Sequence, residues 1–284
     1  MKFQEQRRRF RELLAGGRCH FAGPMHDPVS AMAASQLGFE CGMLPGSIAS
    51  LSVLGAPDVT VITLPELAEQ ARRICRATGI PLIVDADHGY GNALNVQRTV
   101  QELENAGVSA ITIEDTALPR PYGQTAKTTL IPLAEGVGKM RAALAARRDP
   151  GLVIVGRTSA VAATDVADAL ERVLAYEAAG VDMVFLAGLK RWADLEAIAG
   201  KVSVPIMLGS VPPDFGDAER LGAAGVRVSL IGHKPYMASV KALIDTLRLL
   251  REDPRAAASV IAPAEFEQII GKRAYAEAAA SFLQ

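Results

Sequence analysis

Residues 80–92, with the sequence IPLIVDADHGYGN, decide how the rest of the chain is interpreted. Their apolar first half predicts a buried strand, and the acids and glycines that follow predict a turn at the carboxyl end of that strand. Alternate side chains of a strand share a face, so we expect Asp85 and Asp87 to point the same way. Two carboxylates this close repel each other, and the end of the strand therefore needs a compensating charge.

A second apolar run, residues 110–113, is followed directly by Glu114. If the two runs are neighbouring strands of a parallel sheet, Glu114 lies beside Asp85 and Asp87. Three crowded carboxylates have raised pKa values unless a cation neutralises them. Ligation by oxygen atoms with few protein contacts suits Mg²⁺, with Mn²⁺ as the alternative ion. The simpler interpretation is that the aspartates cap the helix that follows.

Short apolar runs recur along the whole chain, each after a segment with helical periodicity. About eight such units are present, which is the number that closes a (β/α)8 TIM barrel. Three of the helical segments end in the tripeptide Ala-Gly-Val, which supports an internal repeat. The expected strands are 19–22, 41–44, 82–84, 110–113, 152–155, 183–186, 206–208 and 226–231, and the expected helices are 63–78, 92–106, 132–147, 164–179, 191–199, 214–224 and 235–250.

We therefore predict a single α/β domain over residues 1–284, with an extra helical piece at each end. Residues 4–14 have the pattern of an amphipathic helix that plugs the bottom of the barrel or lies across it. A helical tail begins at about residue 255, and its Ala-rich part, 264–283, carries apolar side chains that need a cover. The cover is either the protein's own barrel or a neighbouring subunit, and the sequence leaves both open.

Composition excludes several other classes of protein. The 284 residues are 50% hydrophobic, enough for a large core, and the formal net charge of −1 with mixed charges provides no basic stripe for nucleic acid. The polar amino terminus lacks the apolar segment of a signal peptide, and no apolar run approaches the ~20 residues of a membrane span. We expect a cytoplasmic protein. The three cysteines, Cys19, Cys41 and Cys75, lie in apolar contexts and are predicted to be buried, reduced thiols.

Active sites of such barrels lie at the carboxyl ends of the strands. Three further side chains are predicted there, namely Ser47 after the second strand, Arg157 at the end of the fifth and His233 after the last. Together with the acids they suit a small dianion, because arginine grips a carboxylate bidentately and serine adds a hydrogen bond. The alternatives are that Ser47 and His233 cap their own helices and that Arg157 only balances the acids.

Several motifs, taken together, resemble the isocitrate lyase/phosphoenolpyruvate mutase superfamily, and the similarity covers nearly the whole chain. The specific match is the Asp-Ala-Asp-His-Gly-Tyr-Gly-Asn of residues 85–92, and further matching segments are 47–58, 113–115, 135–139 and 156–158. Within the superfamily, residues 37–42, 93–95 and 232–233 are most similar to the magnesium-dependent oxaloacetate decarboxylase branch.

The resemblance implies a role for each acid. Asp85 would ligate Mg²⁺ directly, and Asp87 and Glu114 would hold its water ligands. The implied reaction is the conversion of oxaloacetate, or a close 2-oxo acid, to pyruvate and CO₂ by a carboxy-lyase, with the metal as a Lewis acid that stabilises the enolate. The family also implies a homotetramer, a dimer of dimers that exchanges terminal helices between barrels.

Roles for the remaining rim residues follow from the same resemblance. Ser47 and Arg157 would bind the substrate carboxylate, and His233 would contact the substrate as a hydrogen-bond donor to the C2 oxygen or as a group that orients the departing carboxylate. Asp58 would lie close behind these groups. Arg157 and His233 are thus the predicted catalytic side chains, in addition to binding the substrate.

The loop after the fourth strand distinguishes between the reactions of the superfamily. Its lyases carry a cysteine in this loop, whereas the matching stretch here, residues 120–124, has Tyr122 in that place. This argues against isocitrate or methylisocitrate cleavage, and the asparagine-containing loop pattern of the mutase and of phosphonopyruvate hydrolase is also missing. Residues 119–130 are expected to close over the site and exclude water.

Two departures from the branch concern the far end of the substrate. Residues 209–213, GSVPP, replace a segment that carries a tyrosine in the decarboxylases, and Ser159 replaces an asparagine. Alternative substrates are therefore a different β-substituted 2-oxo acid, a substituted malate or methylisocitrate-type compound cleaved by a carbon-carbon lyase, or a phosphonopyruvate-type compound. The alternatives outside catalysis are a dicarboxylate-binding protein and a scaffold.

Overall fold

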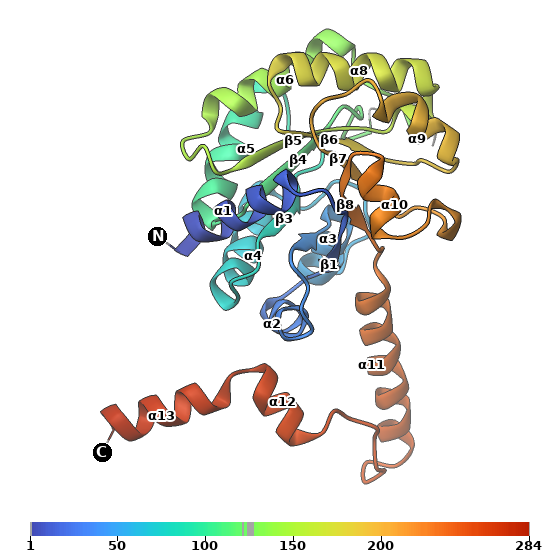
Figure 1. Ribbon diagram of the computed structural model, residues 1–284. Helices are drawn as coiled ribbons and strands as arrows, with labels where there is room; N and C mark the ends of the chain where they lie inside the picture. Colours follow the sequence, from blue (N-terminus) through green and yellow to red (C-terminus); the bar gives the residue numbers. More distant parts are fainter. Residues whose placement is uncertain (1, 121, 124–127, 284) are drawn as a thin grey trace.

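The computed structural model describes residues 2–120, 122–123 and 128–283 and contains a closed barrel of parallel strands. Each strand pairs with the next along the chain, and the last pairs with the first (Figure 1). The predicted TIM barrel is therefore confirmed, with strand positions close to those expected. The strands are β1 (His20–Pro24), β2 (Gly42–Leu44), β3 (Leu82–Asp85), β4 (Ala110–Glu114), β5 (Val153–Thr158), β6 (Met183–Leu186), β7 (Ile206–Leu208) and β8 (Val226–Leu230).

The chain forms helices, most of which cover the outside of the barrel (Figure 1). They are α1 (Lys2–Ala15), α2 (Pro28–Gln36), α3 (Gly46–Leu54), α4 (Leu64–Ala77), α5 (Ala93–Ala106), α6 (Leu133–Ala146), α7 (Ala160–Ala163), α8 (Val166–Ala179), α9 (Trp192–Ala199), α10 (Ala218–Ala223), α11 (Lys234–Glu252), α12 (Pro263–Ile269) and α13 (Lys272–Phe282). Where one helix was expected over 214–224, the chain forms a short 3-10 turn, η1 (Pro213–Phe215), and then α10, because Gly216 at a φ of 90° separates them.

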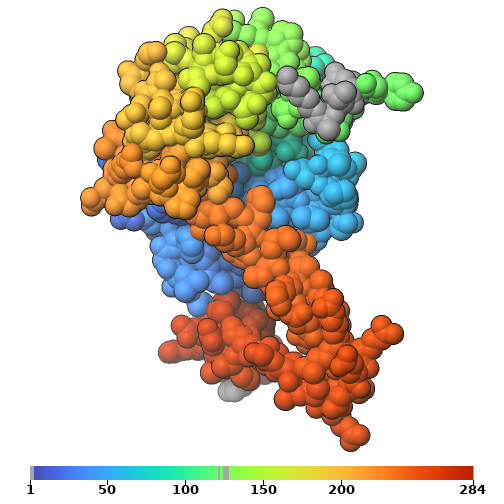
Figure 2. All heavy atoms as spheres, turned by 90° about the vertical axis from the view of Figure 1, so that its right-hand side faces the viewer, coloured from blue at the N-terminus to red at the C-terminus, as the bar shows by residue number. Residues whose placement is uncertain are grey.

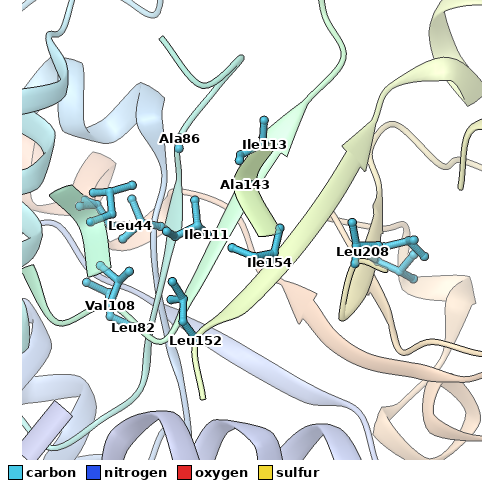
Figure 3. Close-up of a cluster of buried hydrophobic side chains, with 14 of the residues drawn as sticks. Leu44, Leu82, Ala86, Val108, Ile111, Ile113, Ala143, Leu152, Ile154 and Leu208 are labelled. Carbon is cyan, nitrogen blue, oxygen red and sulfur yellow. The ribbon is translucent and has the colours of Figure 1, made fainter. Parts of the chain in front are cut away.

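The core has two layers, one on each face of the strands. The larger lies between the barrel and its helices, and Figure 3 shows Leu82, Ile111 and Ile154 of three neighbouring strands beside Ala143 of α6. The smaller fills the inside of the barrel with side chains such as Met183. Strands buried on both faces explain why their sequences are continuous apolar runs rather than alternating ones.

Helix α1 closes the bottom of the barrel, as the sequence predicted. Phe10 and Leu14 join the inner core layer, and Phe10 is fully buried. The helix is fixed by polar contacts to backbone carbonyls that precede the strands. The Nε2 of Gln6 donates to the Thr78 oxygen at 2.8 Å, and the Nε of Arg7 donates to the Val108 oxygen at 2.9 Å.

The carboxyl-terminal helices depart from the expected arrangement. Helix α11 was expected as a helix over 235–250, and together with α12 and α13 it leaves the body as an arm (Figures 1 and 2). Every described residue in these three helices keeps part of its surface exposed. The expected helix over 264–283 is two helices, because Gly271 adopts a φ of 66° between them. A contact back to the body runs from Gln36 Nε2 of α2 to the Gln268 oxygen at 3.0 Å.

No helix in the described ranges is both long and apolar enough to cross a bilayer. All three cysteines are buried as expected, and none forms a disulfide within the described residues. Burial raises the pKa of the Cys41 thiol to about 12, so this side chain stays protonated and unreactive at neutral pH.

Candidate active site

The carboxyl ends of the strands surround a cavity of about 370 Å³. All the site residues predicted from the sequence line it, although they come from five different parts of the chain. They are Ser47, Asp58, Asp85, Asp87, Glu114, Arg157 and His233. The structure therefore brings the whole predicted set together, and what each residue does stays a prediction.

Asp87 lies in the turn after β3 and not in the strand, so the alternation of side chains along a strand does not apply to it. Strand β3 ends at Asp85, and Asp87 has a φ of 46°, in the left-handed region. Its backbone N–H donates to Asp85 Oδ1 at 3.3 Å, and its carbonyl accepts from the N–H of Glu114 at 2.8 Å. Both aspartates reach the same cavity, as expected, but Asp87 does so from a turn and not from the strand.

A close approach of two loops holds the Asp87 carboxylate in place. A Cβ atom at Gly46, at the start of α3, would lie 2.7 Å from Asp87 Oδ1. Glycine at this position therefore allows the loop after β2 to pass directly against the acid. The carboxylate is buried as a result, with 8% of the residue exposed.

The acids carry more negative charge than the protein around them neutralises. Burial and the neighbouring carboxylates of Asp85 and Glu114 raise the pKa of Asp87 to about 8. Burial also raises the pKa of Glu114, against the attraction of Arg157. One guanidinium faces three carboxylates here, so the site favours an additional cation.

Arg157 pairs with two of the acids. Its Nη1 donates to Asp85 Oδ2 at 2.7 Å, and its Nη2 lies 3.2 Å from Glu114 Oε2. The guanidinium lies 5.3 Å from the ring centroid of Phe185, a cation-π contact that fixes its plane. Its Nε is buried without a partner among the described residues. Arg157 thus balances the acids, as the simpler interpretation held, and still has donors for a ligand.

The donor set fits a hard divalent cation. In the described part of the chain, no three carboxylate, imidazole or thiol side chains already form a ligand cluster. Mg²⁺ does not need one, because it keeps several of its water molecules and takes few direct protein ligands. The oxygens of Asp85, Asp87 and Glu114 around one buried cavity are of the type that such an ion prefers.

Ser47 and His233 face each other at the same cavity. Ser47 Oγ and His233 Nε2 are 3.4 Å apart, and both residues lie at helix starts, in α3 and before α11. Neither helix start has a side-chain capping hydrogen bond, so the capping interpretation does not explain them. Burial and the charge of Asp85 raise the pKa of Asp58, which lines the same wall.

Two threonines that the sequence did not single out support the acids. The Oγ1 of Thr112 donates to Asp85 Oδ1, and that of Thr116 donates to Glu114 Oε2, both at 3.0 Å. Thr112 is the register partner of Asp85 and lies two residues before Glu114. Its place on the same face of β4 was a signal that alternation along the strand would have revealed.

Lys139 lies in the segment 135–139, one of those that resemble the superfamily. This lysine on α6 is buried, with 3% exposed, and its Nζ donates to the His88 oxygen at 2.9 Å. Burial lowers the pKa of the ammonium group. The bond holds the turn that carries Asp87 from the outer side of the barrel, which makes Lys139 a positioning residue rather than a rim residue.

The predicted closing loop, residues 119–130, falls partly outside the described residues, because 121 and 124–127 are not described. Its base is held by an antiparallel bridge between Thr116 and Leu130. Tyr122, which stands where the lyases have a cysteine, is fully exposed.

Comparison with known proteins adds a family to this geometry. A family model described as phosphoenolpyruvate phosphomutase matches residues 10–251. A protein of Bradyrhizobium diazoefficiens named oxaloacetate decarboxylase is 50% identical over 279 residues, which are 98% of this chain and 96% of that protein.

Solved structures agree with these matches. A phosphoenolpyruvate phosphomutase from Streptomyces platensis subsp. rosaceus has a TM-score of 0.88 and 27% identity, over 98% of this chain and 99% of that one. A phosphonopyruvate hydrolase in complex with oxalate and Mg²⁺ has a TM-score of 0.86 and 28% identity, over 98% and 99% of the two chains. Similarity to both structures extends over the barrel and the carboxyl-terminal helices alike.

Proposed function

Because the chain belongs to the phosphoenolpyruvate phosphomutase family, within the isocitrate lyase/phosphoenolpyruvate mutase superfamily, we propose that it is a magnesium-dependent oxaloacetate decarboxylase. The observation that carries the proposal is the cavity in which three acids, Arg157, Ser47 and His233 meet. A relative that is named for this activity, and is 50% identical over 98% of this chain, supports oxaloacetate as the substrate. The reaction breaks the C3–C4 bond of oxaloacetate and yields pyruvate and CO₂.

Arg157 and Ser47 would hold the C1 carboxylate. The guanidinium has five N–H donors, and its contacts to Asp85 and Glu114 leave others for a bidentate grip on the carboxylate. The hydroxyl of Ser47 would add one hydrogen bond. This binding fixes the C3–C4 bond relative to the acids, which is the orientation that cleavage requires.

Asp85 would hold Mg²⁺ directly, and Asp87 and Glu114 would hold its water ligands, with Mn²⁺ as the alternative ion. The chemistry that the bound ion supplies is Lewis-acid stabilisation of the negative charge that develops on the C2 oxygen. The magnesium in the structurally similar phosphonopyruvate hydrolase supports this choice of ion. The pKa values of Asp87 and Glu114, raised first by burial and also by the charge of Asp85, are in keeping with a site that a cation would stabilise.

His233 would act on the reacting part of the substrate. Its Nε2 lies 3.4 Å from Ser47 Oγ, so a substrate held by Ser47 lies within reach of the imidazole. A hydrogen bond from His233 would stabilise the C2 oxygen or orient the departing carboxylate. After CO₂ leaves, C3 takes a proton, and water can supply it.

The test is a screen for substrates with NMR detection of product. Oxaloacetate, methylisocitrate, 2,3-dimethylmalate, phosphonopyruvate and phosphoenolpyruvate are each incubated with the enzyme, in MgCl₂ and in EDTA. We expect pyruvate from oxaloacetate well above the spontaneous rate in MgCl₂ only. Turnover of another compound in its place would contradict the proposal, and saturable binding of oxalate without any turnover would favour a dicarboxylate-binding protein.

We also propose that the protein is a homotetramer in which the carboxyl-terminal helices dock on neighbouring barrels. The support is the exposed apolar side chains of the arm, among them Leu243, Leu247, Tyr275 and Phe282. Light scattering on the full chain would give the oligomeric state. A monomer at micromolar concentration would contradict this proposal.

A cytoplasmic location is proposed as well, with no nucleic-acid partner. Three buried cysteines without disulfides within the described residues are typical of a reducing compartment. Fractionation of the producing cells would test the location.

A further inference from the structure

A buried carboxylate that the proposed mechanism does not use lies directly behind the cavity. Asp115 follows Glu114 at the end of β4, and its side chain has no exposed surface. Glu114 lines the cavity, whereas Asp115 faces the layer between the barrel and its helices, where its partners are Tyr176 and Arg172 of α8. A carboxylate taken out of water destabilises the fold unless donors compensate it, so Asp115 depends on these two partners.

The hydrogen bonds around Asp115 connect three parts of the chain. Tyr176 Oη donates to Asp115 Oδ2 at 2.7 Å, and Arg172 Nη1 donates to the same oxygen at 3.1 Å. Burial and then the charge of Asp115 raise the pKa of Tyr176, so the phenol keeps its proton and remains a donor at neutral pH. Arg172 Nη1 also donates to the Ile131 oxygen at 3.1 Å, which ties the end of β4 to the segment that leads into α6.

Two glycines make room for the tyrosine. A Cβ atom at Gly136 of α6 would lie 2.5 Å from Tyr176 Oη, and one at Gly156 of β5 would lie 3.0 Å from Tyr176 Cδ2. Both approaches are closer than ordinary van der Waals contact, so a side chain at either place would displace the ring. Gly156 directly precedes Arg157, and the ring therefore packs behind the strand end that carries the arginine.

The tyrosine thus contacts the ends of both strands that form the ion pair in the cavity. Its hydroxyl holds Asp115, next to Glu114, and its ring packs on Gly156, next to Arg157. Glu114 and Arg157 are register partners, and the N–H of Asp115 donates to the Arg157 oxygen at 3.3 Å. In the cavity, Arg157 Nη2 lies 3.2 Å from Glu114 Oε2. Movement of either strand end would change this distance.

We propose that Tyr176 and Asp115 are positioning residues, which hold Glu114 and Arg157 at the spacing that binding of the cation and the substrate requires. This inference rests on the proposed function. Neither Tyr176 nor Asp115 lines the cavity, so both act through the strand ends that they hold from outside. Removal of a group that orients a metal site in this way typically lowers metal affinity or activity by roughly 10- to 100-fold.

The test measures binding of Mn²⁺ to enzyme freed of metal with EDTA, from the electron paramagnetic resonance signal of the free ion. Tyr176→Phe removes only the hydroxyl and should raise the Kd for Mn²⁺ by about tenfold. Asp115→Asn keeps the shape of the side chain but loses the charge that pairs with Arg172, and it should raise the Kd by about tenfold or more. In MgCl₂, kcat/KM for oxaloacetate should fall in both variants by at least the same factor.

The matched control is Asp182→Asn at the closed end of the barrel. Asp182 is also a mostly buried carboxylate, which accepts from Arg11 at 2.9 Å and from Arg147 at 2.6 Å, but it does not line the active-site cavity. Its substitution should lower the urea midpoint of unfolding, as Asp115→Asn does. Because Asp182 is remote from the acids, the Kd for Mn²⁺ should stay within about twofold.

The double variant shows whether Tyr176 and Asp115 act through the bond between them. If they do, Tyr176→Phe should raise the Kd for Mn²⁺ by less than about twofold in the Asp115→Asn background. Fully additive effects, or an unchanged Kd in both single variants, would overturn the inference and leave the proposed function standing. Absence of both Mn²⁺ binding and oxaloacetate turnover in the unmodified enzyme would overturn both.

Discussion

The two ends of the barrel contain the same kinds of charged side chain in opposite balance. At the closed end, Arg7 lies 2.7 Å from Asp149, and Asp182 is shared by Arg11 at 2.9 Å and Arg147 at 2.6 Å. Each of these carboxylates faces at least one arginine. At the open end, Arg157 pairs with Asp85 and Glu114, and Asp87 lies in the same cavity without an ion pair among the described residues.

The paired charges of the closed end hold the structure together, whereas the partly unpaired acids of the open end are typical of a functional site. The arginines of the closed end also donate to backbone carbonyls, such as the Glu104 oxygen at 2.6 Å from Arg7 Nη2, and so fix α1 across the barrel. At the open end, burial and the neighbouring carboxylates raise the pKa of Asp87, and burial raises that of Glu114 although Arg157 attracts it. Unbalanced charge in a cavity costs stability that a bound cation would restore, and this imbalance is typical of a functional site.

The largest effect is expected from removal of one acid at the open end. Asp85→Ala should lower kcat/KM for oxaloacetate by about a thousandfold or more, because it removes the proposed direct ligand of an ion whose Lewis acidity would be worth several kcal/mol. Stability in EDTA should change little, since the repulsion removed between carboxylates offsets the lost ion pair with Arg157. Pyruvate formation in MgCl₂ and thermal unfolding in EDTA measure the two quantities.

The matched control for Asp85→Ala is Asp149→Asn at the closed end. It should leave kcat/KM within about twofold, because Asp149 belongs to the bonds that hold α1 and not to the cavity. Full activity in Asp85→Ala would contradict the assignment of the metal site.

The reverse pattern, a loss of stability with little change in activity, is expected when Phe10 at the closed end is substituted. Phe10→Ala should lower the free energy of unfolding by about 3–5 kcal/mol, since Phe10 is fully buried among the side chains inside the barrel. The kcat/KM of the folded protein at 25 °C should stay within about twofold. Urea unfolding followed by circular dichroism gives the first value. A loss of activity as large as that of Asp85→Ala would show that the two ends are coupled.

The contrast between the ends also shows what the sequence predicts well. The barrel was predictable because each parallel strand is a continuous apolar run. The position of the acids was predictable because active sites of such barrels lie at the carboxyl ends of the strands. Helices α2 and α3 were not predicted, since PVSAMAASQ and GSIASLSVL consist largely of small and apolar residues and lack a polar stripe.

Other features could not be read from residue order at all. Asp87 reaches the cavity through a left-handed backbone conformation, which strand alternation does not predict. The partners of Arg157 and the ring of Phe185 beside it depend on register between strands. The apolar face of α11 indicates that another surface packs against it, but the residue pattern does not show which surface that is.

Binding of Mg²⁺ at the open end should raise the free energy of unfolding, by less than Phe10→Ala lowers it. At a free Mg²⁺ concentration a hundredfold above its Kd, the free energy of unfolding should rise by about 2.7 kcal/mol, because only the folded chain brings the acids together. Urea unfolding in MgCl₂, compared with NaCl at equal ionic strength, measures this rise. Phe10→Ala should keep it and Asp85→Ala should lose it. An equal rise in both variants would mean that the ion binds elsewhere.

The smallest effect is a pH-dependent one at the closed end. Burial opposes ionisation of Asp149, but the guanidinium of Arg7 and the N–H of Gly151 outweigh it and lower the pKa of the carboxyl. A carboxyl with a lowered pKa in the folded state stabilises the protein above its unfolded pKa of about 3.9 and loses this contribution as the pH falls through the folded value. Asp149→Asn should therefore cost about 1 kcal/mol at pH 7, where the charged hydrogen bond is lost. The difference from the unmodified protein should shrink below about pH 4, as urea unfolding at pH 7, 5, 4 and 3 would show. A constant difference across that range would assign the cost to packing and not to the ion pair with Arg7, and the contrast between balanced and unbalanced charge would then rest on the open end alone.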